Sequence, residues 1–116
     1  MTRIEPKDSV LMRQGDQASA MYVIRRGKVR LLRSQRHGEV ALRDLTEGDC
    51  FGEHALLRNK AYSETALALT DCELAVLRIE HLAFAMIKDH SFRRMVEAYL
   101  YSVDPDGDPF DRFDWE

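Results

Sequence analysis

The sequence predicts a mainly β domain, an antiparallel sandwich or barrel, followed by two helices. Short apolar runs rich in β-branched and aromatic residues fill the first two thirds of the chain, and turn signals separate them every ten residues or so. A βαβ fold would need longer helices between its strands than this spacing allows. Beyond residue 79 the apolar residues recur with the period of a helix. Because the chain has 116 residues, we expect one domain.

The predicted strands are short apolar runs that end at polar turns. The first covers residues 10–12 and ends at Gly15-Asp16, and runs at 21–24 and 29–32 follow. After a polar loop predicted over 34–39, apolar residues alternate with polar ones from 40 to 45, as far as Gly48-Asp49. Two more short strands are predicted between 67 and 79, around Thr70-Asp71. Residues 1–9 are polar, and Pro6 predicts an extended entry.

Two helices are predicted in the last third of the chain. Apolar residues place the first over about 80–89, and Ser91 is the expected N-cap of the second. The apolar stripe of the second helix consists of Phe92, Met95, Val96, Tyr99, Leu100 and Val103. Asp104-Pro105 ends this helix. We expect residues 1–102 to form the domain and residues 103–116 to form a disordered acidic tail.

Composition and charge narrow the classes of partner. The apolar fraction is 45%, which is enough for a core. Six acidic residues against Arg112 give the tail a charge of −5, and the total of −3 leaves +2 for the rest of the chain. We therefore expect no nucleic-acid partner. Without an apolar run of about 18 residues we expect no membrane association and a cytoplasmic location. Cys50 and Cys72 are predicted to be buried free thiols.

The candidate binding site is residues 50–69, CFGEHALLRNKAYSETALAL. This order predicts a strand, a tight turn at Gly52, one helical turn, a polar loop and another strand. A helical turn entered from a glycine presents backbone N–H groups and the positive end of its dipole, which suits a small anion. Glu53 beside these groups suits a sugar hydroxyl. The stretch is therefore interpreted as a cradle for a phosphate and a ribose.

Catalysis and metal binding are not indicated. His37, His54, His81 and His90 are scattered, and no His/Cys cluster or Ser/His/Asp arrangement is evident in the sequence. We expect neither an enzyme nor a resident metal or cofactor.

Three stretches resemble the cyclic nucleotide-binding domain family: Gly15-Asp16, then MYVIRRGKV at 21–29, then GDCFGEHAL at 48–56. The resemblance covers roughly residues 8–102. It implies a double-stranded β-helix, or jelly roll, of about eight strands capped by helices. In this family a Gly-Glu pair begins the phosphate-binding cassette. The Glu binds the ribose 2′-hydroxyl, the amides of the helical turn bind the cyclic phosphate, and an Arg about nine or ten residues after the Glu neutralises that phosphate.

The ligand-binding residues that the resemblance implies here are Phe51, Gly52, Glu53, His54, Ala55, Tyr62 and Ser63. Gly52 and Glu53 match the family, whereas His54 stands where an apolar residue is usual. The Arg position falls at Tyr62 or Ser63, and no Arg lies between residues 59 and 70. A charge-assisted contact of this kind contributes ~1.5–3 kcal/mol.

Two nearby charges bear on the missing Arg. Lys60 is a flexible point charge without the fork of an Arg, and Glu64 adds a negative charge near the same loop. Each site residue also has a plainer reading. Glu53 complements a helix dipole, Tyr62 and Ser63 are loop residues, and His54 is a rim histidine.

Two functions remain open on the sequence. The first is a regulatory module that senses cyclic AMP, cyclic GMP or a related nucleotide weakly, because the Arg is absent. The alternative is a degenerate domain that no longer binds nucleotide and serves protein–protein contact or oligomerisation, with the helix over 91–103 as the seam of a homodimer.

Overall fold

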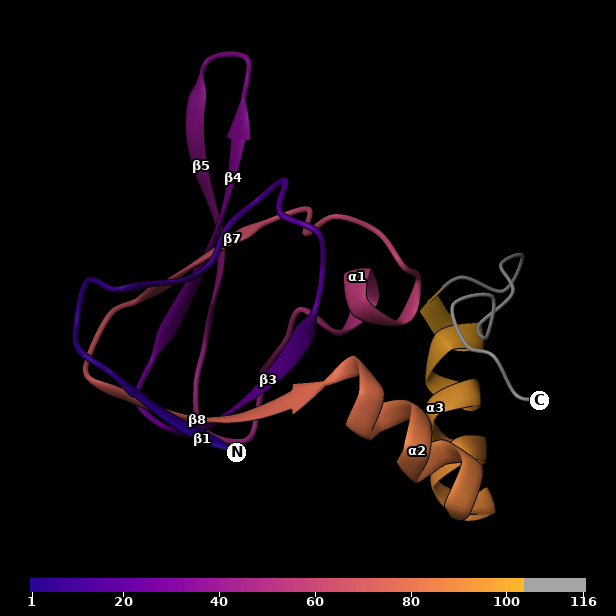
Figure 1. Ribbon diagram of the computed structural model, residues 1–116. Coiled ribbons are helices and arrows are strands. Elements are labelled where there is room, and N and C mark those ends of the chain that lie inside the picture. Colours follow the sequence, from indigo (N-terminus) through magenta and orange to yellow (C-terminus); the bar gives the residue numbers. More distant parts are fainter. Residues whose placement is uncertain (104–116) are drawn as a thin grey trace.

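The computed structural model describes residues 1–103, and the side chains of residues 1–98. Its eight strands form two four-stranded antiparallel sheets, and helices follow them (Figure 1). One sheet has the order β1 (Thr2–Glu5), β8 (Cys72–Arg78), β3 (Ala20–Arg26) and β6 (Cys50–Phe51). The other has the order β2 (Val10–Met12), β7 (Thr65–Ala68), β4 (Val29–Gln35) and β5 (Gly38–Leu45). These two sheets form the predicted jelly roll, and the fold class is confirmed.

The core lies between the two sheets, because alternate side chains of the inner strands β3, β8, β4 and β7 point inward. Tyr22 and Ile24 of β3 and Leu74 of β8 are buried from one side, and Val29 and Leu31 of β4 are buried from the other. Burial of a side chain of this size stabilises the fold by about 1.5–3 kcal/mol. The period of two therefore places one face of each strand in the core and leaves the other to the surface.

Three helices complete the domain: α1 (Glu53–Leu57), α2 (Ile79–Lys88) and α3 (His90–Val103). The short α1 is anchored by Leu56 and Leu57, which are 0% and 3% exposed. Leu82 and Met86, four residues apart on α2, are buried against the roll. Figure 1 shows α1 at the end of the roll that faces α2 and α3.

The N-terminal segment and the predicted polar loop both contain more strand than expected. Residues 2–5 form β1, which pairs with β8 from Thr2 opposite Ala75 to Glu5 opposite Cys72. The loop predicted over 34–39 is reduced to residues 36 and 37, because β4 and β5 form a tight hairpin that projects from the roll (Figure 1).

The start of each C-terminal helix also differs from the prediction. Ile79 opens α2 instead of ending a strand. Asp89, not Ser91, caps α3, because its Oδ1 accepts hydrogen bonds from the backbone N–H groups of Ser91 at 3.0 Å and Phe92 at 3.1 Å. An aspartate just before the first helical residue is a favourable N-cap.

Some predictions concern the termini and the thiols. α3 includes Val103 of the predicted tail, whereas residues 104–116 and their predicted disorder lie outside the described residues. No helix in the described part of the chain is both long and apolar enough to cross a bilayer. Both cysteines are free thiols, Cys72 buried as predicted and Cys50 only half-buried.

Candidate functional site

A cavity at the N-terminal end of α1 brings the seven predicted site residues together. It is lined by Met12, Leu31, Arg43, Phe51, Gly52, Glu53, His54, Ala55, Tyr62, Ser63 and Glu64. β6 and α1 supply one wall, the loop between α1 and β7 supplies a second, and β2, β4 and β5 supply the remainder. Residues distant in the sequence therefore meet around one hollow, and their role as ligand contacts stays a prediction.

Gly52 turns the chain from β6 into α1. Its φ is +84°, in the left-handed region that glycine adopts most readily. A Cβ at this position would lie 3.2 Å from Met12 Sδ, 3.3 Å from the carbonyl oxygen of Ala20 and 3.3 Å from Tyr62 Cε1. The site needs glycine both for its backbone conformation and for the closeness of its neighbours.

Glu53 opens α1 and faces two environments. It lines the cavity, and its carboxylate also acts on the neighbouring Cys50. Burial first, and the charge of Glu53 second, raise the pKa of the Cys50 thiol to about 11. Cys50 is therefore a protonated thiol at neutral pH, and the carboxylate of Glu53 is the group that carries charge here.

Tyr62 stands at one of the two positions where the resemblance places an Arg, and its hydroxyl is already engaged. The hydroxyl donates a hydrogen bond to the carbonyl oxygen of Ala20 at 2.7 Å and accepts one from the Ala20 N–H at 3.3 Å. The backbone of Tyr62 also pairs with the loop before β3, through the N–H of Gly15 and the carbonyl of Asp16. Tyr62, 6% exposed, therefore offers the cavity its ring, while its hydroxyl ties the loop to β3.

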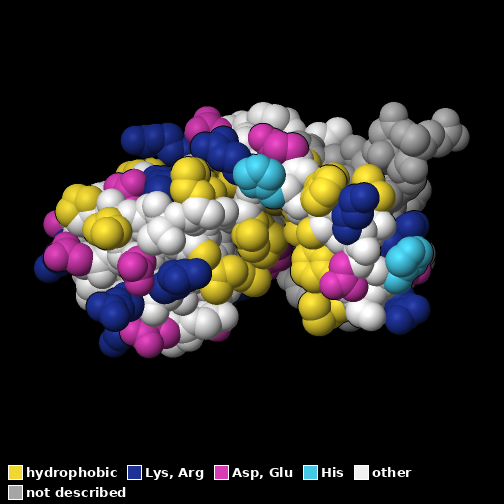
Figure 2. Space-filling model, turned by 60° about the horizontal axis from the view of Figure 1, so that its bottom comes forward, with side chains coloured by type: hydrophobic (Ala, Val, Ile, Leu, Met, Phe, Trp, Pro, Cys, Tyr) yellow, Lys and Arg dark blue, Asp and Glu magenta, His cyan; other side chains and the backbone are white. Residues whose placement is uncertain are grey.

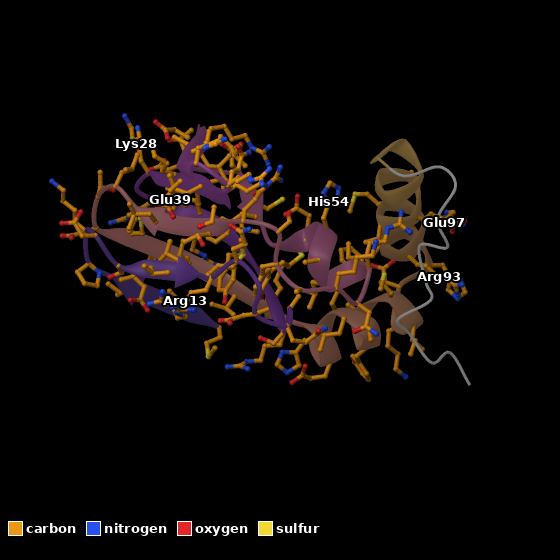
Figure 3. All side chains as sticks on the ribbon, turned by 90° about the horizontal axis from the view of Figure 1, so that it is seen from above. Arg13, Lys28, Glu39, His54, Arg93 and Glu97 are labelled. Atoms are coloured by element: carbon orange, nitrogen blue, oxygen red, sulfur yellow. The ribbon has the colours of Figure 1, made fainter. Side chains whose placement is uncertain are left out.

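Ser63 and His54 lie at the rim. Ser63 is exposed and lines the cavity beside Tyr62. His54 is also exposed, and Figure 3 shows it projecting from α1 on the side of the roll nearest α3. Both side chains are exposed at the edge of the cavity, and their contact with a ligand stays a prediction.

The charges around the cavity differ from the expectation in two ways. Glu64, predicted to work against an anion, is paired with Arg33 of β4, at 3.4 Å between Arg33 Nη2 and Glu64 Oε1. Arg43 of β5 lines the cavity although the sequence reasoning did not select it. Lys60 is not among the lining residues. Among the lining residues, the Arg comes from the sheet and not from the loop.

A pattern in the sequence does signal Arg43. Leu42 and Leu45 are three residues apart, so they cannot share one face of a regular strand, whose side-chain period is two. A β-bulge between Leu31 and Leu32 breaks the register, and Leu31 then lies opposite Arg43. Leu45 is buried and Leu42 only partly so, which places Arg43 on the inner face with Leu45.

An apolar groove runs beside the cavity, where the roll and α1 meet α2 and α3. It is lined by Met21, Cys50, Glu53, Leu57, Leu77, Leu82, Phe92, Met95 and Val96. Figure 2 shows hydrophobic side chains gathered between the two parts of the molecule. Phe92 and Val96 pack against the core, whereas Met95 is 64% exposed. The part of the predicted α3 stripe with described side chains is thus divided between the roll and the surface, and Tyr99, Leu100 and Val103 lie outside the described side chains.

The comparisons with known proteins agree with this geometry. A family model described as "Cyclic nucleotide-binding domain" matches residues 3–89. The Cyclic AMP receptor protein of Thermus thermophilus is 40% identical over 83 residues, which are 70% of this chain and 38% of that protein. The cAMP-dependent protein kinase regulatory subunit of Eremothecium gossypii is 33% identical over 85 residues, 73% of this chain and 17% of that protein.

Solved structures show the same similarity. The crystal structure of the Thermus thermophilus Catabolite Activator Protein matches with a TM-score of 0.75 and 31% identity, over 91% of this chain and 52% of that chain. The cAMP-bound form of EAL enzyme Bd1971 matches with a TM-score of 0.71 and 26% identity, over 89% of this chain and 28% of that chain. This chain spans about half or less of the length of each of these four proteins.

Proposed function

The chain belongs to the cyclic nucleotide-binding domain family, and we propose that it is a regulatory module that takes cyclic AMP, cyclic GMP or a related nucleotide in the cavity at α1. The observation that carries the proposal is the convergence of Glu53, the first turn of α1 and Arg43 on one cavity. A hydrogen-bond acceptor for a sugar and positive charge for a phosphate then lie within one hollow. Relatives named for cyclic AMP support the choice of ligand class.

Each part of the cavity has a distinct role in this proposal. The carboxylate of Glu53 accepts a hydrogen bond from a ribose hydroxyl. The first turn of α1, at His54 and Ala55, directs backbone N–H groups toward a phosphate. Phe51, 1% exposed, and the ring of Tyr62 form apolar walls. The two kinds of wall suit a ligand with one charged group and one flat, mostly apolar part.

We propose that the binding is weak. No Arg stands at Tyr62 or Ser63, where the resemblance places one, and the hydroxyl of Tyr62 is engaged by Ala20. Loss of one charge-assisted phosphate contact of ~1.5–3 kcal/mol corresponds to about a 10- to 150-fold weaker affinity than in a cassette with the Arg.

Titration calorimetry with cyclic AMP and cyclic GMP, up to millimolar concentration, tests the proposal. We expect saturable heat with one of them, and a weaker response from a Glu53→Gln variant because the ribose hydroxyl loses its acceptor. Ser34→Ala on the β4 strand, whose side chain is not among the lining residues, is the control. If the wild-type chain gives neither binding heat nor a thermal shift with either nucleotide, the proposal of nucleotide sensing is wrong.

Coupling to α3 would make the binding a signal. Leu57 of α1 and Phe92 and Val96 of α3 line the same groove beside the cavity. A ligand that displaces α1 therefore changes the surface on which α3 packs. The relative populations of the conformations of α3 then change. Hydrogen exchange with and without ligand should show altered protection in α2 and α3. Unchanged protection in these helices would contradict the coupling between ligand binding and α3.

A second candidate function is an interaction or oligomerisation module. The observation in its favour is exposed apolar surface on the helices, with Phe84 62%, Ile87 48% and Met95 64% exposed. Light scattering on the wild-type chain and on a Met95→Lys variant tests this candidate. Met95 is chosen because it is exposed, whereas Phe92 and Val96 pack against the roll and their substitution would disturb folding. We expect a dimer that the variant breaks. A wild-type chain that is monomeric at high concentration would contradict this candidate.

The extent of the domain is also part of the proposal. We place the folded unit within residues 1–102 and the acidic tail after it. A chain truncated after Val103, where α3 ends, should keep its thermal midpoint, and a fall of many degrees would show that the tail belongs to the folded unit.

A further inference from the structure

Arg43 faces the cavity because of its place in the sheet. It lies opposite Leu31, which is 1% exposed and also lines the cavity. Two residues along the strand, Leu45 is buried on the same inner face. The next residue, Asp44, points outward and pairs with Arg30 at 2.8 Å. The alternation along β5 therefore directs Arg43 toward the mouth of the cavity, where its guanidinium remains exposed.

Arg43 is also available for an external anion. The arginines of the neighbouring strand are both paired, Arg30 with Asp44 and Arg33 with Glu64. Among the described residues, the Arg43 side chain has no hydrogen-bond or ion-pair partner within the chain. The pairing of Glu64 with Arg33 also offsets the charge of one of the two carboxylates that line the cavity. The cavity thus holds a guanidinium whose donors are not used by the fold.

We propose that Arg43 binds the phosphate of the ligand and restores part of the charge that is absent at Tyr62 and Ser63. The inference rests on the proposed function. The guanidinium presents donors in a planar fork that matches phosphate oxygens. Its origin differs from that of a loop cation, because it is carried by β5, an edge strand that pairs with β4 from Gly38 to Leu45. The β-bulge at Leu31 and Leu32 is the local feature that sets this direction.

The test compares ligands with and without a phosphate. Affinities for cyclic AMP and for adenosine are measured by calorimetry for the wild type, Arg43→Gln and Arg43→Lys. We expect Arg43→Gln to weaken cyclic AMP binding about 10- to 100-fold and Arg43→Lys to weaken it less, because lysine keeps the charge but not the fork. Adenosine binding should be equal in all three proteins.

Arg36→Gln is the matched control, because it removes the same charge from the tip of the same hairpin, outside the cavity. It should change the cyclic AMP affinity less than twofold. An equal loss in Arg36→Gln and Arg43→Gln would overturn the proposal in favour of a general charge effect. Equal losses for cyclic AMP and adenosine would also overturn it. If Arg43→Gln binds cyclic AMP as well as the wild type does, the role of Arg43 is wrong and the proposed function stands. If the wild type does not bind cyclic AMP, both the role of Arg43 and the proposed function are wrong.

Discussion

A glycine-to-alanine pair separates two reasons for the glycine at the entry to α1. Gly52 and Gly48 have almost the same φ, at +84° and +89°. A Cβ on Gly48 would have no heavy atom within 4 Å, whereas a Cβ on Gly52 would meet three atoms at 3.2–3.3 Å. Gly48→Ala therefore measures the backbone cost, and Gly52→Ala measures that cost together with crowding.

The magnitudes follow from these distances. A left-handed backbone costs an alanine about 1–2 kcal/mol, and the reduced freedom of the unfolded chain offsets about 0.4–1 kcal/mol of this. We expect Gly48→Ala to lower the free energy of unfolding by about 1 kcal/mol. The crowding at Gly52 adds about 1–3 kcal/mol, because the carbonyl of Ala20 belongs to the central strand β3 and cannot move aside easily.

Urea unfolding of the three proteins, followed by circular dichroism, gives both numbers. The same proteins are then titrated with cyclic AMP, since the new methyl group would also fill part of the cavity. We expect Gly52→Ala to be less stable than Gly48→Ala by about 1–3 kcal/mol. Equal stabilities of the two variants would refute the reasoning that close packing, and not only φ, requires a glycine at residue 52.

Three further outcomes are expected. Asp89→Ala should lower the free energy of unfolding by about 1 kcal/mol through the loss of the α3 cap, whereas Ser91→Ala should change it little; the reverse order in denaturant titrations would restore Ser91 as the cap. Iodoacetamide should alkylate Cys50 slowly at pH 8 because its raised pKa keeps the thiol protonated, and Glu53→Gln should move the pH–rate curve to lower pH. Fast alkylation of Cys50 in peptide mass mapping, or a pH–rate curve that Glu53→Gln does not move, would contradict the influence of burial and of Glu53 on the Cys50 pKa. Tyr62→Phe should cost about 1–3 kcal/mol by leaving backbone groups of β3 unpaired, and a variant as stable as wild type in urea would contradict the tether.

The sequence predicted those parts of the fold in which the apolar pattern is regular. The strands around Tyr22, Leu31 and Leu74 are short apolar runs bounded by turn signals, so their positions follow from the sequence. β1 does not, because it is an edge strand whose Ile4 is 78% exposed, and its pairing depends on β8 and not on its own residues. Local propensity says little about such a strand.

The site was predictable only where it is continuous in the sequence. The residues of β6 and α1 adjoin one another in the chain, and the spacing to Tyr62 follows from the family. Arg43 enters from another sheet, and its direction depends on the bulge in the β4–β5 pairing. The engagement of the Tyr62 hydroxyl depends on how the loop meets β3, a tertiary contact that no periodicity records.

That contact between Tyr62 and Ala20 has a consequence for how the domain would respond to a ligand. A loop that must become ordered on binding converts part of the interaction free energy into its own ordering. Here the loop is fastened to β3 in the absence of any ligand. We therefore expect ligand binding to change the conformation of this loop little. The conformational response to a ligand would then be confined to α1 and α3. The side chain at residue 62 can hold the loop against β3 or neutralise a phosphate, but not both. Tyr62→Arg would therefore replace a hydrogen bond that is always present with a contact that forms only when the ligand is bound.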